Sequence, residues 1–526
     1  MNTKLKYFGL FFTLVLFATC KKDIKEIINV SEKASFIIYT YDEYGCPSGS
    51  ASGFFISKEG IGITNYHALD GATKAVIITL DSSKYEIDKI LGSDSKKDII
   101  KFQIKNTKQK TFSTLEFSTK DATKGDRIYC ISNPLALQNT LTEGIISAVR
   151  KDKQRGNVIQ FSAPISPGSS GGAILNEDGK VIAVATYSKK GGQNLNFGVK
   201  LNSDLLASIS EDEFTRKNPK FAKRDNFIIL NVKSDNDPFI ILNGIEFGDN
   251  LTTLYLTYIN LHLTPKDTRW GIWLELNKKD EGFYIKEIGG SVKHYVISSS
   301  VGEDASHATD VPLATSLRYK VYFPKINSKI KNIEIAEGND LSDDKWANLN
   351  LDDYKSIETF DIDKFQNVYA FSLLKEGDIE QSENLFYDIL TNNPEDIEAL
   401  NTLGVIAYVK DNKNDALSYF SKAIEVNPSS PVSYINRSFV YESQGNLQLA
   451  INDASKAINI APLQSDYFAR REKLYYKIGD KISSFEDFKK AHALIEKLYH
   501  LEKWDLSNIK STVQICRFMD ELSKNF

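Results

Sequence analysis

The chain contains little cysteine or proline and has no excess of basic residues, although it is 526 residues long. Thirteen Pro and 30 Gly are too few for a fibrous or low-complexity protein. The 65 basic residues against 69 acidic ones argue against nucleic-acid binding. At about 150 residues per domain, the length predicts three or four domains. A disulfide-rich scaffold and a cysteine zinc cluster are excluded because the four cysteines are scattered, at Cys20, Cys46, Cys130 and Cys516.

The longest apolar run lies at the N-terminus. Residues Phe8–Phe17 follow Lys4 and Lys6, and are too few to span a bilayer of about 30 Å but suit the core of a signal peptide. The lone Cys20 that comes after them resembles the lipidated cysteine of a bacterial lipobox. The resemblance implies a signal peptide with lipobox at 1–20 and a lipid anchor on a bacterial membrane, facing the periplasm or the cell surface. A plain secretory signal, with an incidental Cys20, is the alternative.

Short runs of β-branched and aromatic residues, separated by turn residues, fill the region 31–210. Many short strands of this kind predict a β-barrel or a β-sandwich. Charged residues without periodicity at 211–225 indicate a linker, and strands resume in a β-rich, sandwich-like region at 226–345 without a recognisable chemical motif. The strands expected in the first region are 35–41, 53–57, 61–66, 74–80, 98–104, 127–131, 158–163 and 181–187.

The C-terminal region repeats itself with a period of 34 residues, which separates Pro394, Pro428 and Pro462. This period, together with the order of small and large apolar residues, resembles tetratricopeptide repeats, which form an α-solenoid. The resemblance implies that residues 363–524 form repeats closed by a C-terminal capping helix at 501–522, and that they recruit a protein partner or substrate. A structural spacer is the alternative. The four predicted units are 363–396, 397–430, 431–464 and 465–498.

The segment Ser166–Gly172 offers a nucleophile in a glycine-rich turn. Cleaving a peptide bond needs a nucleophile, a base, a group that orients the base and donors for the oxyanion. Glycines allow a turn to aim two amides at one point, so we expect the amides of Gly168 and Ser170 to form the oxyanion hole and Ser170 to be the nucleophile. His67, which is the only His within 31–210, follows an expected strand, and Asp98 opens another.

The order His67, Asp98, Ser170 resembles the trypsin-like double β-barrel serine proteases. Seven short blocks resemble the bacterial HtrA/Deg type within that family. The resemblance implies a serine endopeptidase of the cell envelope, in which His67 is the base, Asp98 orients it and no metal or organic cofactor is needed. No loop typical of a peptide-binding PDZ domain is evident downstream. The blocks are Gly49–Phe54, Thr64–His67, Asp98–Ile100, Ser132–Leu135, Thr142–Ser147, Pro167–Gly172 and Asn196–Val199.

The resemblance also locates the primary specificity pocket. In this fold the residue six before the nucleophile lies at the pocket base, and here it is Pro164, with Ala185, Tyr187 and Phe197 as walls. Without a carboxylate in the pocket, a substrate ammonium would be buried without a partner. We therefore predict cleavage after Val, Ala or Ile rather than after Lys, Arg or Glu.

Two other functions remain open. The protease region could be a catalytically silent scaffold in a lipoprotein that acts through its repeats, but the intact His67, Asp98 and Ser170 favour catalysis. A glutamyl endopeptidase of the same fold typically places a second His in its pocket. The next His in this chain is His262, outside the predicted domain, which counts against that alternative.

Overall fold

The computed structural model describes residues 23–499, except for short gaps. The predicted signal peptide and lipobox, with Cys20, and the predicted capping helix at 501–522 lie outside the described residues. No helix in the described part of the chain is long and apolar enough to cross a membrane. The gaps are 108, 134–139, 154, 167, 189–194, 210–211, 236–239, 261–269, 273–282, 302–308, 312–314, 338–343, 358–359 and 376–378.

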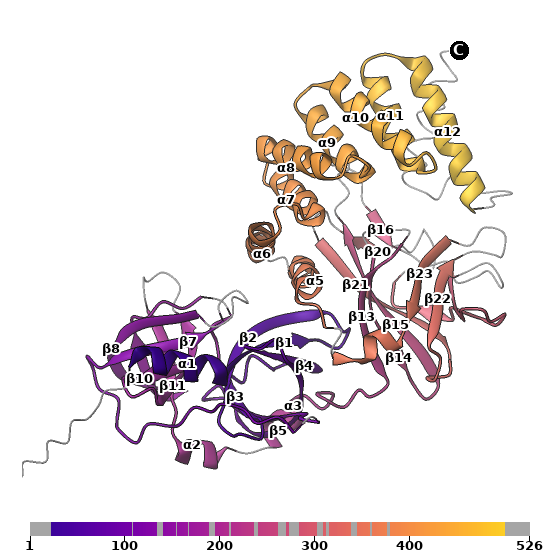
Figure 1. The fold of residues 1–526 in the computed structure, drawn as a ribbon. Helices are drawn as coiled ribbons and strands as arrows, with labels where there is room; N and C mark the ends of the chain where they lie inside the picture. The colour runs from indigo at the N-terminus through magenta and orange to yellow at the C-terminus, as the bar shows by residue number, and fades with distance from the viewer. Residues whose placement is uncertain are drawn as a thin grey trace, which may run out of the picture.

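The first region folds as two closed antiparallel β-barrels (Figure 1). A helix that the sequence did not predict, α1 (Ile24–Ala34), leads into the first barrel, and its buried Ile27 and Ala34 join an apolar cluster with residues of both barrels. The first barrel has the order β1-β2-β3-β6-β5-β4. Its strands are β1 (Ser35–Tyr41), β2 (Pro47–Phe55), β3 (Ile61–Thr64), β4 (Lys74–Thr79), β5 (Lys84–Asp94) and β6 (Ile99–Ile104).

The second barrel has the order β10-β11-β12-β9-β8-β7. Together the two barrels confirm the predicted double β-barrel, and each of the eight expected strands overlaps an observed one. Strand β5 was missed because Lys, Asp and Gly interrupt its alternation of apolar residues. The strands of the second barrel are β7 (Arg127–Ser132), β8 (Thr140–Asp152), β9 (Gly156–Phe161), β10 (Ala173–Asn176), β11 (Val181–Ser188) and β12 (Asn196–Lys200).

The segment predicted as a linker at 211–225 is instead packed on the first barrel. After the short helix α2 (Ser203–Ser208) comes α3 (Asp212–Lys217), whose Phe214 is buried against Tyr66 with ring centroids 5.4 Å apart. Phe221 is also buried and meets Phe214 edge to face. The prediction was wrong because two buried aromatic side chains anchor this segment, although Lys217, Lys220 and Lys223 remain exposed.

The described residues of the middle region form three β-sheets. A five-stranded sheet of order β13-β14-β15-β21-β19 and a four-stranded sheet of order β18-β17-β22-β23 contribute to one apolar core, where Phe283 of one sheet contacts Phe323 of the other. The last strand ends at Asn350, beyond the predicted boundary at 345. The strands are β13 (Phe227–Lys233), β14 (Ile240–Phe247), β15 (Leu251–Asn260), β16 (Trp270–Ile272), β17 (Phe283–Glu287), β18 (Lys293–Tyr295), β19 (Ser298–Ser299), β20 (Thr309–Val311), β21 (Thr315–Pro324), β22 (Asn332–Glu337) and β23 (Asp344–Asn350); β16 pairs with β20.

The C-terminal helices stack in pairs, as Figure 1 shows, and each predicted repeat unit holds one pair. The small residues Ala423, Ala457 and Ala491 are buried, and this lets neighbouring helices approach closely. The helical repeats predicted from the 34-residue period are therefore confirmed. The helices are α4 (Asp352–Lys355), α5 (Ile362–Lys375), α6 (Ile379–Asn392), α7 (Ile397–Val409), α8 (Lys413–Val426), α9 (Pro431–Ser443), α10 (Leu447–Ile460), α11 (Ser465–Lys477) and α12 (Lys481–Tyr499).

The first repeat helix, α5, contacts both the first barrel and the middle sheets (Figure 1). Phe365 packs against Tyr39 and Tyr41 of β1, at 4.7 and 5.3 Å between ring centroids. Ser372 donates a hydrogen bond to the carbonyl of Pro47, at the start of β2. Strand β2 continues from Pro47 towards the predicted catalytic residues, so the repeats rest on a strand that also supports the site.

Candidate active site

His67 and Asp98 are in direct contact. Nδ1 of His67 lies 2.7 Å from Oδ2 of Asp98, and the backbone amide of His67 donates to Oδ1 at 2.9 Å. The His67 side chain is about half exposed, whereas that of Asp98 is 9% exposed. A buried carboxylate that engages both groups fixes the orientation of the imidazole and leaves the other ring nitrogen, Nε2, free to face a reactant.

The backbone at Asp98 adopts an uncommon conformation, with φ of 56°. Side chains in this left-handed region cost free energy unless neighbouring contacts hold them. The buried Asn65 supplies one such contact, because its Nδ2 donates to the Asp98 carbonyl at 2.8 Å. Asn65 Nδ2 also reaches Oγ1 of Thr186 at 3.3 Å, which ties the two barrels together beside the site.

Ser170 lies in a tight turn between the barrels. Gly168 and Gly171 both have φ of 87°, which favours glycine. A Cβ at Gly171 would also lie 2.1 Å from the Ser52 carbonyl oxygen, so no other residue fits there. The Ser52 hydroxyl donates to the Gly168 carbonyl at 2.8 Å, and the Ser52 amide donates to the Ser170 carbonyl at 2.8 Å. One residue of β2 thus holds both ends of the turn.

The amides of Gly168 and Ser170 remain available to a ligand. Among the described residues, neither N–H donates to another group, whereas the amides of Ser169, Gly171 and Gly172 are all hydrogen-bonded. Two free amides, one of Ser170 itself and one two residues before it, are the type of donor that an oxyanion needs.

The Ser170 hydroxyl donates to the Thr186 carbonyl at 3.3 Å. Within the part of the chain that the structure describes, no hydrogen bond joins Ser170 to His67. The structure therefore brings His67 and Asp98 into contact, whereas the Ser170 hydroxyl is hydrogen-bonded to Thr186. Hydrogen bonds between catalytic groups are often loose without substrate, so this geometry is compatible with a triad.

The residues predicted to line the specificity pocket occupy different environments. Ala185 is fully buried in the core of the second barrel. Pro164 is exposed, and its carbonyl accepts a hydrogen bond from the Thr142 hydroxyl at 2.9 Å. Tyr187 and Phe197 stack with ring centroids 4.8 Å apart and an interplanar angle of 9°. Burial raises the pKa of Tyr187, with a further contribution from Asp152.

A cavity of about 470 Å³ opens beside His67. Several residues that the sequence did not single out line this cavity. They belong to no sequence motif, and only the fold brings them to the site. Arg155 is the most notable of these, since it comes from the turn between β8 and β9. The lining residues are Tyr66, His67, Asp70, Ser95, Asp98, Arg155, Thr186, Tyr187 and Lys217.

Tyr66, which precedes His67, is held in place by the α3 segment. Its ring packs on Phe214, and Lys217 lies 5.6 Å from the ring centroid. Burial, together with the charges of Asp70 and Glu213, raises the pKa of Tyr66 to about 12. The neutral phenol thus forms one wall of the cavity at ordinary pH.

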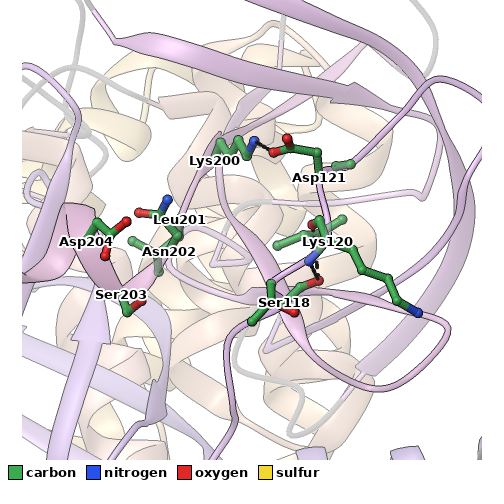
Figure 2. A pocket seen from close by; sticks show the side chains of 11 residues that line it. Ser118, Lys120, Asp121, Lys200, Leu201, Asn202, Ser203 and Asp204 are labelled. Carbon is green, nitrogen blue, oxygen red and sulfur yellow. Dashed lines mark hydrogen bonds and ion pairs between the residues drawn. The ribbon is translucent and has the colours of Figure 1, made fainter.

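Figure 2 shows a second cavity, of about 250 Å³, whose lining includes neither His67 nor Ser170. Among its lining residues, Lys200 forms an ion pair with Asp121, and the Ser118 hydroxyl accepts a hydrogen bond from the backbone amide of Lys120. No sequence-predicted site residue lines this cavity. Lys120, also in the lining, pairs with Asp178 outside it, and we assign this cavity no role in catalysis.

Comparisons with known proteins agree with the fold of two regions. Residues 51–184 match the family model described as the trypsin-like peptidase domain, and residues 431–462 match a tetratricopeptide repeat. Protease Do-like 1, chloroplastic, from Arabidopsis thaliana is 32% identical over 180 residues, which are 32% of this chain and 40% of that protein. A probable periplasmic serine endoprotease DegP-like from Chlamydia muridarum is 37% identical over 179 residues, 31% of this chain and 35% of that protein.

A solved HtrA-type protease, AlgW with a tripeptide, is 26% identical, with a TM-score of 0.32; the match covers 35% of this chain and 61% of that one. This chain thus spans less than half the length of the two curated relatives named above. The similarity to serine proteases lies in the barrels and supports the prediction of a serine endopeptidase.

Proposed function

We propose that this protein is a serine endopeptidase of the cell envelope, with His67, Asp98 and Ser170 as its catalytic triad. The observation that carries the proposal is the double contact of Asp98 with His67, beside a glycine turn whose two amides are free. The similarity of the barrels to serine proteases adds independent support.

In the proposed mechanism, Ser170 attacks the carbonyl carbon of the scissile peptide bond. For this step its hydroxyl leaves the Thr186 carbonyl and donates to Nε2 of His67, which takes the proton as the C–O bond forms. Asp98 holds the proton of Nδ1 in place and stabilises the imidazolium. His67 then protonates the departing amine as the C–N bond breaks, and water hydrolyses the acyl-enzyme by the same steps.

The amides of Gly168 and Ser170 would bind the oxyanion during both steps. Their contribution requires that the turn keep its conformation when charge develops. Ser52 supplies that rigidity, because it is buried and bonds to both Gly168 and Ser170. Losing one such donor typically costs about a hundredfold or more in turnover.

For the residue that precedes the cut, we propose a small aliphatic side chain. Pro164 at the proposed base carries no charge, and the Tyr187–Phe197 stack offers an apolar wall. Burying a Val or Ile there would gain about 1.5–3 kcal/mol. A library profile dominated by Lys, Arg or Glu at that position would contradict this assignment.

Active-site labelling of the purified full-length protein tests the triad directly. We expect a fluorophosphonate probe to label the parent and not Ser170→Ala, and casein cleavage to be lost in the same variant. Ser166→Ala is the matched control, because Ser166 lies in the same turn with an exposed side chain. Equal labelling of Ser170→Ala and the parent would refute the proposal, and a folded parent that does not label would instead favour a silent scaffold.

We also propose that Cys20 is lipidated and anchors the protein to a bacterial membrane. The cysteine that follows the apolar N-terminal run and the periplasmic location in the name of the Chlamydia relative support this location. Cys20→Ala should release the protein from the membrane fraction or leave its precursor unprocessed. Failure of labelled palmitate to enter the parent would refute lipidation.

The remaining regions are proposed to serve recruitment. Tetratricopeptide repeats bind extended segments of other proteins along a continuous surface, so we propose that α5–α12 recruit a substrate or partner. The middle strands would form a sandwich-like domain that supports the first repeat helix. A chain truncated after α6, which keeps the contacts of α5 with the first barrel and the middle sheets, should retain fluorophosphonate labelling and lose only the cleavage of recruited proteins.

A further inference from the structure

The cavity beside His67 contains an arginine without a carboxylate partner. Arg155 is partly buried, its Nε is completely buried, and that atom has no hydrogen-bond partner in the structure. A buried guanidinium donor without an acceptor is unfavourable, because the group has lost its hydrogen bonds to water without gaining others. Because Arg155 lines the cavity, a carboxylate bound there would give its guanidinium the acceptor that the protein does not provide.

The position of the Arg155 guanidinium is fixed by stacking. Its Cζ lies 4.8 Å from the centroid of the Tyr187 ring, and Tyr187 in turn stacks on Phe197. The backbone amide of Arg155 donates to Asp152 at 2.8 Å, which holds the turn while leaving the guanidinium free of that carboxylate. A planar cation held in this way loses little conformational entropy when it binds a carboxylate through two hydrogen bonds.

The other charged groups that line the cavity are already engaged. Asp98 is bound to His67. Asp70 is exposed and accepts a hydrogen bond from Asn218, and Lys217 pairs with Glu213 at 3.4 Å. Of the described cations that line this cavity, Arg155 alone has no carboxylate partner.

We propose that Arg155 is a specificity-determining residue that selects peptides with an Asp or Glu side chain close to the cleaved bond. The inference rests on the proposed function. It concerns a different subsite from the primary pocket, which would hold an aliphatic residue. Tyr187 contacts Arg155 and is a proposed wall of the primary pocket, so the acidic and aliphatic subsites are adjacent.

A positional peptide library incubated with the full-length protein tests this inference. At one position close to the cleaved bond, we expect kcat/KM for Glu or Asp to exceed that for Gln or Asn by about tenfold, and the preference to weaken as salt is added. Arg155→Gln should abolish the ratio, and Arg155→Glu should shift the preference towards Lys and Arg. Lys153→Gln, an exposed neighbour in the same turn, is the control and should keep the acidic preference.

The outcomes separate the inference from the function on which it rests. Cleavage of acidic and neutral peptides at equal rates, or an acidic preference that survives in Arg155→Gln, would overturn the role of Arg155 alone. If no peptide is cleaved and the fluorophosphonate probe does not label Ser170, the proposed function falls, and the inference falls with it. Labelling of Arg155→Gln at the parental rate would show that a lost preference does not reflect a damaged nucleophile.

Discussion

The carboxylate of Glu213 accepts two hydrogen bonds from Ser95, one from its amide at 3.1 Å and one from its hydroxyl. Ser95 stands three residues before Asp98, so α3 holds the segment that carries this aspartate. Directly after α3, the Asn218 side chain accepts a hydrogen bond from the amide of Gly71 at 2.8 Å and donates one to Asp70 at 3.1 Å, beside His67. The two loops that bring His67 and Asp98 together are thus joined by a segment outside the barrels.

Removing the Glu213 carboxylate should weaken this connection. We expect Glu213→Ala to lower the free energy of unfolding by about 1–3 kcal/mol and to reduce kcat more than it raises KM. Glu213→Gln is the matched control, since its side-chain oxygen can still accept one of the two hydrogen bonds, and its effect should be smaller. Urea unfolding and steady-state kinetics measure the two effects, and parental kcat in Glu213→Ala would contradict a positioning role.

The same contact predicts a pH effect. Hydrogen bonds from Ser95 lower the pKa of Glu213. A carboxyl group with a lowered pKa stabilises the folded state above the unfolded pKa, about 4.3, and this contribution is lost as the pH falls through the folded value. The stability difference between the parent and Glu213→Gln should therefore shrink on acidification below about pH 4, as followed by thermal unfolding. A stability difference between the two proteins that does not change with pH would contradict this prediction.

Gly171 offers a test of the turn that carries Ser170. Gly171→Ala combines an unfavourable positive φ with a Cβ 2.1 Å from the Ser52 carbonyl oxygen, so we expect loss of soluble, folded protein. Gly125 also has a positive φ, 96°, but nothing lies within 4 Å of the position of its Cβ. Gly125→Ala should therefore cost only about 1–2 kcal/mol. Similar unfolding midpoints for the two variants would show that the close contact at Gly171 is unimportant.

Arg437 and Asp453 form a two-point ion pair, at 2.8 and 2.9 Å, that Arg471 and Asp487 repeat 34 residues later. Because the Asp453 side chain is 8% exposed, Asp453→Ala would leave a partly buried arginine unpaired and should cost about 3–5 kcal/mol. Asp487→Ala should cost a similar amount. Replacing the pair with Arg437→Met and Asp453→Leu should restore most of the stability. Failure of the double variant to exceed Asp453→Ala would contradict this account.

Glu472 predicts that the stability of the solenoid falls as the pH rises, which is opposite to the effect expected for Glu213. Burial raises its pKa to about 7. The folded state therefore retains a proton that the unfolded chain releases near pH 4.3, so stability falls as the pH rises towards 7. At pH 8 we expect Glu472→Gln to be more stable than the parent by up to about 3 kcal/mol, with no difference near pH 4. Exposed Glu486→Gln is the control, and equal thermal stability of Glu472→Gln and parent at pH 8 would refute the prediction.

The sequence alone determined the features that depend on local order along the chain. A short run of β-branched and aromatic residues predicted the strand at Ser35–Tyr41, which the structure reproduces as β1, and the 34-residue period predicted each helical pair. The glycines around Ser170 predicted a turn because a positive φ favours glycine whatever the surroundings are. Such signals are local, so they can be read without knowledge of the fold.

Only the tertiary structure decided which distant residues meet. Glu213 reaches Ser95 across 118 positions, and Arg155 reaches the cavity of His67 from the turn before β9. Neither residue has a distinctive neighbourhood in the sequence, and the charges around Glu213 predicted a linker instead of a packed helix. The burial of Phe214 brings Glu213 to Ser95, and closure of the second barrel positions the turn that carries Arg155. Both depend on packing among residues far apart in the chain.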